Sequence, residues 1–193
     1  MAEHGIVFVV SSPSGGGKGS ILADLLQRDA RIRRAVSATT RAPREGEIDG
    51  RHYHFLSRER FERWIREGRF VEWATVHGEC YGTLKSEIEG ILESGLDAVL
   101  ELDVQGMRSL TRQRDDVVSI FIMPPSIETL EERLRARGGL SEEELRLRLK
   151  NAGEEIAAKK EYDRVLLNDV LRDAVRAFET ILSEAREKAV DQA

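Results

Sequence analysis

The sequence is organised around one stretch, Ser12-Pro13-Ser14-Gly15-Gly16-Gly17-Lys18-Gly19-Ser20. The apolar run at residues 6–10 is typical of a buried parallel strand, and residues 21–26 have the spacing of an amphipathic helix. Strand, glycine-rich turn, lysine and helix in this order predict a loop that binds phosphate. In such a loop, backbone N–H groups and the positive end of the helix surround the phosphate oxygens, and Lys18 adds a full charge.

The stretch departs from the usual pattern G-x-x-x-x-G-K-S/T at two positions. Ser12 stands where the pattern has its first glycine, and Gly19 stands where it has a hydroxyl. Because Gly19 has no hydroxyl to offer to Mg²⁺, we expect Ser20, a carboxylate or water to serve instead. The alternative is a flexible glycine and serine turn that binds nothing, and the flanking strand and helix argue against it.

Length and composition favour one soluble globular domain. Of 193 residues, 40% are hydrophobic and 34% charged, and the net charge of −5 does not favour a nucleic-acid partner. Cys80, as the single cysteine, excludes an internal disulfide and fits a reducing cytoplasm. No apolar run approaches the ~20 residues of a membrane span, and residues 1–5 lack the basic region of a signal peptide. We therefore expect a cytoplasmic protein without a membrane partner.

Residues 37–83 differ in composition and in hydrophobic pattern from the segments around them. They are polar and mixed, and they predict a helix at 57–67 with short strands at 52–55, 70–76 and 80–83. This segment resembles a small α+β lobe inserted into a larger α/β core.

The rest of the chain alternates apolar strands with helices, which predicts a mainly parallel sheet covered by helices on both faces. Ligands of such sheets bind at the carboxyl ends of the strands. The expected strands are 98–103, 117–123 and 165–167, and the expected helices are 85–93, 126–137, 141–161 and one that begins near Leu171.

Eight motifs, taken together, resemble those of the guanylate kinases in order and spacing over about residues 5–185. They are Ser14-Gly15-x-Gly17-Lys18-Gly19-Ser20, Thr39-Thr40-Arg41-x-Pro43-Arg44-x-Gly46-Glu47, Asp49-Gly50-x-x-Tyr53-x-Phe55, Glu72-Trp73-Ala74, Tyr81-Gly82-Thr83, Asp103-Val104-Gln105-Gly106, Pro124-Pro125-Ser126 and Arg137-Gly138. The resemblance implies a P-loop NTPase fold that transfers the γ-phosphoryl group of ATP to GMP, giving ADP and GDP, with Mg²⁺. It also implies a domain at 4–186 whose core spans 4–36, 84–125 and 155–189, with a GMP-binding lobe at 37–83 and a lid at 126–154.

The resemblance implies residues for each part of GMP. Glu72 would accept the N1 and N2 protons of guanine, and Ser37 and Thr83 would donate to its O6. The GMP phosphate would be held by a further set, Arg41, Arg44, Tyr53 and Tyr81. The family commonly has tyrosine where this chain has Cys80, which leaves a minor contact of the lobe unassigned.

For ATP and the transfer step, the resemblance implies the loop and the lid. The loop residues are Ser14, Gly15, Gly16, Gly17, Lys18, Gly19 and Ser20. The expected catalytic residues are Lys18 and three arginines, Arg133, Arg137 and Arg148, with Arg146 as a close alternative to the last. Asp103 is expected in the nucleotide site and Asn168 near adenine, where a simple turn is as good an interpretation. No metal ligand is assigned.

Other functions stay open at this point. They are another nucleoside monophosphate kinase, an inactive guanylate-kinase-like binding module, and a P-loop ATPase or GTPase switch. The presence of Lys18, Ser37 and the arginines favours an enzyme that uses ATP and GMP as its small-molecule substrates. Use of dGMP and the oligomeric state are not determined.

Overall fold

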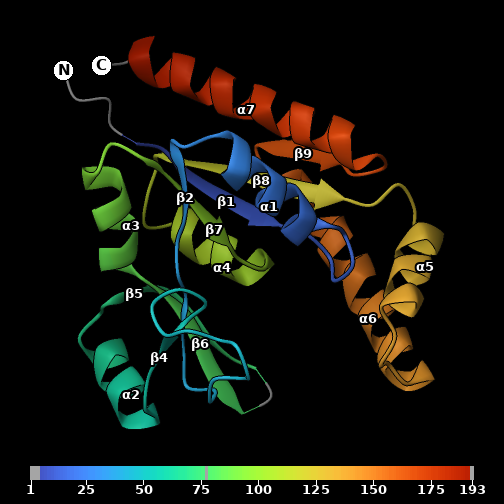
Figure 1. The fold of residues 1–193 in the computed structure, drawn as a ribbon, viewed down its shortest axis with the longest axis horizontal. Helices are drawn as coiled ribbons and strands as arrows, with labels where there is room; N and C mark the ends of the chain where they lie inside the picture. Colours follow the sequence, from blue (N-terminus) through green and yellow to red (C-terminus); the bar gives the residue numbers. More distant parts are fainter. Residues whose placement is uncertain (1–4, 77, 192–193) are drawn as a thin grey trace.

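A central parallel sheet forms the core of the protein in the computed structural model, which describes residues 5–76 and 78–191 (Figure 1). Residue 4, where we expected the domain to begin, and His77, between two predicted strands, lie outside the described residues. The strand order is β2-β7-β1-β8-β9, and every neighbouring pair is parallel. The strands are β1 (Val7–Ser11), β2 (Ile32–Arg34), β7 (Asp97–Glu101), β8 (Val117–Met123) and β9 (Arg164–Leu167). The predicted mainly parallel sheet is confirmed.

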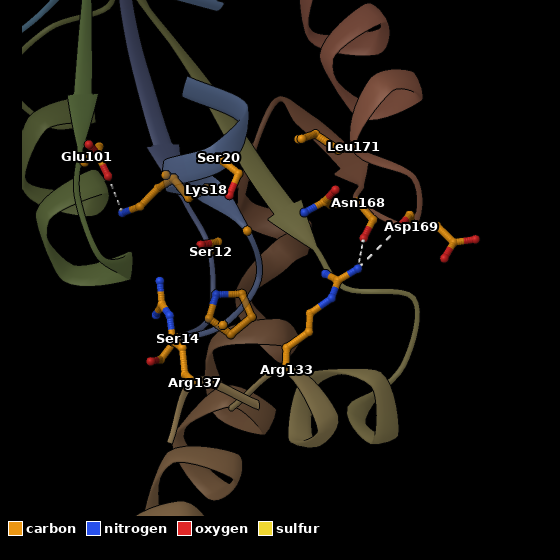
Figure 2. Close-up of a pocket in the computed structure, with 14 residues that line it drawn as sticks. Ser12, Ser14, Lys18, Ser20, Glu101, Arg133, Arg137, Asn168, Asp169 and Leu171 are labelled. Atoms are coloured by element: carbon orange, nitrogen blue, oxygen red, sulfur yellow. Dashed lines mark hydrogen bonds and ion pairs between the residues drawn. The ribbon is translucent and has the colours of Figure 1, made fainter. Parts of the chain in front are cut away.

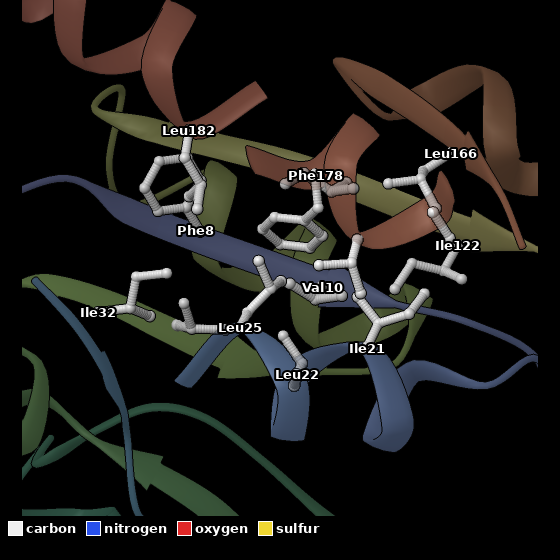
Figure 3. Close-up of a cluster of buried hydrophobic side chains, with 14 residues drawn as sticks. Phe8, Val10, Ile21, Leu22, Leu25, Ile32, Ile122, Leu166, Phe178 and Leu182 are labelled. Atoms are coloured by element: carbon white, nitrogen blue, oxygen red, sulfur yellow. The ribbon is translucent and has the colours of Figure 1, made fainter. Parts of the chain in front are cut away.

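Side chains alternate along β1 between two apolar clusters, one on each face of the sheet. Phe8 and Val10 pack with the helices α1 (Lys18–Arg28) and α7 (Leu171–Asp191) (Figure 3). Val7 and Val9 lie in the opposite cluster, which receives side chains from α3 (Lys85–Glu93) and α4 (Val104–Thr111). Because helices cover both faces, β1 is buried along its whole length, as its unbroken apolar run predicts.

Two elements of the core were not predicted from the sequence. The strand β2 contains one apolar residue, Ile32, followed by two exposed arginines, because it lies at the edge of the sheet. The helix α4 begins directly after Asp103, whose carboxylate accepts a hydrogen bond from Gly106 N at 2.7 Å and caps the helix. The strand expected at 98–103 therefore ends at Glu101, and Asp103 belongs to the start of the helix.

Residues 38–84 form a sheet of their own, with strand order β4-β3-β6-β5. The helix α2 (Arg58–Arg66) packs against it, and Phe61 stacks on Phe70 with 4.4 Å between ring centroids. Ser57 caps α2 by accepting a hydrogen bond from Arg60 N. The strands are β3 (Ala38–Thr39), β4 (His54–Phe55), β5 (Phe70–Val76) and β6 (Glu79–Leu84).

A helical hairpin follows β8 and stands beside the carboxyl ends of the central strands (Figure 1). Its helices, α5 (Ile127–Arg137) and α6 (Glu142–Ala157), are joined by Gly138 and Gly139, both at positive φ. A capping box of Ser141 and Glu144 begins α6, as predicted. The α-helix ends at Ala157 rather than near residue 161, because its last turn tightens into a 3₁₀ helix (Ala158–Glu161). None of the described helices is both long and apolar enough to span a bilayer.

Candidate nucleotide-binding site

The glycine-rich loop connects β1 to α1 and lines a cavity of about 570 Å³ (Figure 2). Gly15 and Gly17 both have a φ of 91°, which residues with a side chain rarely adopt. A Cβ at Gly17 would also lie 2.0 Å from Asn168 Nδ2, so this position admits only glycine. At Gly19, by contrast, a Cβ would meet nothing within 4 Å. The usual hydroxyl is therefore missing from a position that has room for it.

Lys18 occupies the first turn of α1 and contacts an acid from the neighbouring strand (Figure 2). Its Nζ lies 3.5 Å from Glu101 Oε2, at the end of β7. Burial lowers the pKa of Lys18, and the Glu101 carboxylate opposes that shift. Arg34 Nε lies 2.9 Å from the other oxygen of Glu101. The Glu101 carboxylate thus holds Lys18 beside the loop and at the same time pairs with a second cation, Arg34.

Asn168 joins the loop to the end of β9. Its Nδ2 donates a hydrogen bond to Gly16 O at 2.8 Å, and its side chain is buried. Arg133 donates from Nη2 to the carbonyls of Asn168, at 3.0 Å, and Asp169, at 3.4 Å. Its Nη1 is also buried, and no described residue accepts a hydrogen bond from it. The structure therefore places Asn168 and Arg133 together on the β9 side of the cavity.

The three predicted lid arginines all reach the loop region. Arg137 lines the cavity, and Arg148 Nη1 donates to Ser14 Oγ at 2.9 Å. Arg135, two residues before Arg137, instead forms ion pairs with Glu131 and Glu142 at the surface of the hairpin. Arg133 and Arg137, which are four residues apart, therefore lie on the side of α5 that faces the cavity. Arg135, between them in the sequence, lies on another side and stabilises the hairpin.

A second group of predicted residues meets where the small sheet approaches α4. Glu72 on β5 pairs with Thr83 on β6, and its Oε1 accepts a hydrogen bond from Thr83 Oγ1 at 2.8 Å. Burial raises the pKa of Glu72; the hydrogen bond from Thr83 opposes the shift, and the charge of Asp103 adds to it. Ser37 is half-buried just before β3, the strand next to β6. An acid with a hydroxyl neighbour is thus held in a largely desolvated place.

The predicted phosphate-binding residues lie on β6 of the same small sheet and in the loop between β3 and β4. Arg41 Nη2 donates to Glu47 Oε1 at 2.8 Å, and this bond lowers the pKa of Glu47 to about 2. The guanidinium of Arg41 lies 5.5 Å from the centre of the Tyr53 ring, which in turn packs edge-on against Tyr81 at 6.1 Å. The Arg44 side chain is exposed, although its backbone N donates to Glu47 Oε2 at 2.7 Å. Three of the four residues are brought together, and Arg44 stands at the rim.

Sequence reasoning missed three residues that take part in these contacts. Arg34, which binds Glu101, is one of 24 arginines and had no motif around it. Glu47 lay inside a quoted motif, where its spacing from Arg41 could have indicated an ion pair. Glu155 on α6 has its pKa raised by burial and by the nearby charge of Asp103, and it feels the charge of Lys18. No described group of three or more histidine, cysteine, aspartate or glutamate side chains is arranged to bind a metal.

Comparison with known proteins places this arrangement in a family. The family model described as guanylate kinase matches residues 5–185. The chain belongs to the guanylate kinase family. Its relatives include the guanylate kinase of Rubrobacter xylanophilus, 48% identical over 184 residues that cover 95% of each chain. The guanylate kinase of Carboxydothermus hydrogenoformans is 45% identical over 186 residues, covering 96% of this chain and 91% of the relative.

A solved structure agrees with this membership. The crystal structure of guanylate kinase from Anaplasma phagocytophilum superposes with a TM-score of 0.75 at 34% sequence identity, covering 95% of this chain and 87% of that one. The predicted family, P-loop fold and reaction are confirmed. As a guanylate kinase, the chain is an ATP:GMP phosphotransferase.

Proposed function

We propose that the glycine-rich loop and the hairpin arginines of this guanylate kinase hold ATP, while Glu72 and its neighbours on the small sheet hold GMP. The observation that carries the assignment is the Glu72–Thr83 pair, a largely desolvated carboxylate whose hydroxyl neighbour is 2.8 Å away. No ion pair of Glu72 is formed within the described part of the chain, so this carboxylate needs donors from a ligand, because a buried charge left unpaired is costly.

Guanine supplies the donors that this pair lacks. Its N1 and N2 carry protons, and a carboxylate has two acceptor oxygens to receive them. The Thr83 hydroxyl donates to Glu72 in the structure and can turn to donate to O6, as can that of Ser37. Adenine presents an unprotonated N1 that a carboxylate repels. The pocket therefore selects guanine by hydrogen bonding, which discriminates far more strongly than shape alone.

The GMP phosphate would be bound by Arg41 with help from Tyr53 and Tyr81. Arg41 is already oriented by Glu47 and by the Tyr53 ring, so little side-chain freedom is lost when phosphate binds. Because Arg41 stays charged and its guanidinium has five donors, it can keep Glu47 and still face a dianion. Arg44, which is exposed, would close onto the phosphate from the rim.

The phosphates of ATP would lie along residues 14–20, with Lys18 leaving Glu101 for the β- and γ-phosphates. Arg133, whose Nη1 is buried and faces no acceptor in the described part of the chain, is free to take a phosphate or ribose oxygen. The cavity also offers the hard oxygen donors that Mg²⁺ prefers, the Ser20 hydroxyl and the Glu101 carboxylate. When bound with ATP, Mg²⁺ would neutralise charge on the phosphates and help to orient them.

Phosphoryl transfer asks the protein mainly for positioning and charge. Arg137 and Arg148 face the loop and would neutralise the group in transfer, where their charge is worth most. The glycines between α5 and α6 give the hairpin, which we take as the lid, a point at which to close and exclude water. Amide hydrogen exchange at residues 137–148 should slow when an ATP analogue and GMP are both present; unchanged exchange would argue against closure.

A coupled assay of ADP release tests the proposal. With ATP and Mg²⁺, GMP should be phosphorylated at rates higher by orders of magnitude than those for AMP, UMP or CMP, and dGMP can be compared in the same assay. Equal rates with AMP, or no turnover with any nucleotide, would contradict the assignment. We also place the enzyme in the cytoplasm, where a reducing environment suits its single buried Cys80.

A further inference from the structure

We propose that Gln113, assisted by Ser109, is a positioning residue for guanine selectivity, because it holds a one-residue bulge that turns Glu72 toward the nucleotide. The proposal rests on the role of Glu72 proposed above. Neither residue belongs to the motifs that suggested the nucleotide site.

The bulge lies between Phe70 and Glu72 on β5. Phe70 pairs with Leu84 and Glu72 pairs with Thr83, so two steps along β5 correspond to one step along β6. Val71 is the extra residue. Such bulges are common beside active sites, where they redirect a side chain.

Here the bulge decides which face of the small sheet carries Glu72. Paired residues of antiparallel strands point to the same face, and successive residues alternate. Phe70, Leu84 and Cys80 belong to the apolar cluster beneath α2. In a regular strand, Glu72 would point to the same face as Phe70, two positions before it, and so into that cluster. With the bulge, it shares the opposite face with Thr83.

Two side chains from α4 and the turn after it hold the bulge. Val71 O accepts a hydrogen bond from Gln113 Nε2 at 2.7 Å and another from Ser109 Oγ at 3.3 Å. The strand β5 is the edge of the small sheet, so this carbonyl depends on partners from outside the sheet. The Val71 side chain is buried in the core cluster with Met107 and Leu110 of α4.

The other end of α4 approaches Glu72 itself. Asp103 caps the helix, and a Cβ built on Gly106 would lie 3.5 Å from Glu72 Oε2. The helix is in contact with β5. Ser109 and Gln113, near one end of the helix, therefore bind the Val71 carbonyl, and Gly106, near the other end, lies beside the Glu72 carboxylate. Gln113 acts on guanine through the backbone of β5 and does not itself touch the base.

The test compares Gln113→Met, which keeps the length of the side chain without its donor, with the parent enzyme. We expect kcat/KM for GMP to fall about fivefold, the value of one hydrogen bond, and about tenfold or more when Ser109→Ala is added. The preference for GMP over AMP should fall by similar factors, while KM for ATP stays within about twofold. Gln27→Met, the same replacement at an exposed position on α1, is the control and should change none of these values.

A selectivity ratio unchanged from the parent in Gln113→Met/Ser109→Ala would overturn the proposal, even if the variant were less stable. A double-mutant cycle with Glu72→Gln separates this result from failure of the pocket assignment. If Glu72→Gln loses selectivity and Gln113→Met then adds nothing further, both ideas hold. If Glu72→Gln loses selectivity and the Gln113 and Ser109 variants keep it, only the positioning role fails. If Glu72→Gln keeps selectivity, the role of Glu72 is wrong, and the positioning role of Gln113, which rests on it, is wrong as well.

Discussion

The loop that we assign to ATP takes its shape from the backbone, whereas the residues that we assign to GMP act through side chains from several separate segments. Nine consecutive residues, 12–20, form the loop and the start of α1, and two glycines at positive φ set the course of the loop. Glu72 and Thr83 come instead from two strands, β5 and β6, and Arg41 and Tyr53 from the loop between β3 and β4. Backbone N–H groups in a loop bind phosphate groups without distinguishing the base attached to them. Side chains that form hydrogen bonds with the base can select one base over another. The comparison implies that the two sites can be damaged independently.

The largest expected effect comes from Lys18→Ala. Loss of the only side-chain cation at the start of α1 should reduce kcat by about 10³-fold or more, since the charge on the transferred group is then poorly neutralised. Steady-state assays at saturating ATP and GMP measure it. Lys85→Ala, which removes an exposed lysine from α3, should retain parental activity. Loss of less than tenfold in Lys18→Ala would remove Lys18 from the phosphate site.

Glu72→Gln should affect GMP selectively. It exchanges one acceptor for a donor, so a guanine N–H goes unpaired and a charge-assisted bond is lost, which costs on the order of 3–5 kcal/mol. At about 1.4 kcal/mol per decade, kcat/KM for GMP should fall by roughly 10²–10³. AMP should gain relative to GMP. Glu67→Gln, at the exposed end of α2, is the control, and a preference for GMP within threefold of the parent in Glu72→Gln would show that another residue reads the base.

Arg137→Ala tests the hairpin on the ATP side. It should lower kcat by about 10- to 100-fold while the dissociation constants of both substrates change little, because the charge of Arg137 matters most in the transition state. Single-turnover kinetics and equilibrium titration separate the two effects. Arg135→Ala removes an arginine that is paired with Glu131 and Glu142 and should leave kcat near the parental value. If the two variants behaved alike, the division between cavity and hairpin arginines would be wrong.

The smallest effect is a pH dependence. Burial raises the pKa of Glu72 above its ordinary value of 4.5, so the ionised form that accepts from guanine is lost at a higher pH than for an exposed glutamate. The acid limb of kcat/KM for GMP should contain an ionisation above pH 4.5 that disappears in Glu72→Gln. The same raised pKa favours the folded state below pH 4.5, and this contribution to stability is lost as pH rises through the folded pKa. Glu72→Gln should therefore unfold at a temperature no lower than the parent at neutral pH.

The glycine-rich loop could be predicted from the sequence more completely than the small sheet, and the reason is physical. A strand, a glycine loop and a helix are local features, so their order along the chain defines the site; the strand at 117–123 and the helix at 85–93 were likewise predicted to the residue. The salt bridge between Arg34 and Glu101, the pairing of Arg41 with Glu47 and the support of Val71 by Gln113 depend on tertiary contacts. A one-residue bulge has no signature in the sequence, although it determines where Glu72 points. The resemblance to a family supplied Glu72 as a candidate, but not the means by which it is positioned.

Titration calorimetry of Lys18→Ala tests most directly whether the two sites are separate. GMP should bind with a dissociation constant within about threefold of the parent value, since Glu72, Thr83 and Arg41 are untouched. A non-hydrolysable ATP analogue should bind the same variant at least tenfold more weakly than it binds the parent. Loss of GMP binding in Lys18→Ala, with the fold intact by circular dichroism, would contradict the account, because the loop lysine would then belong to both sites.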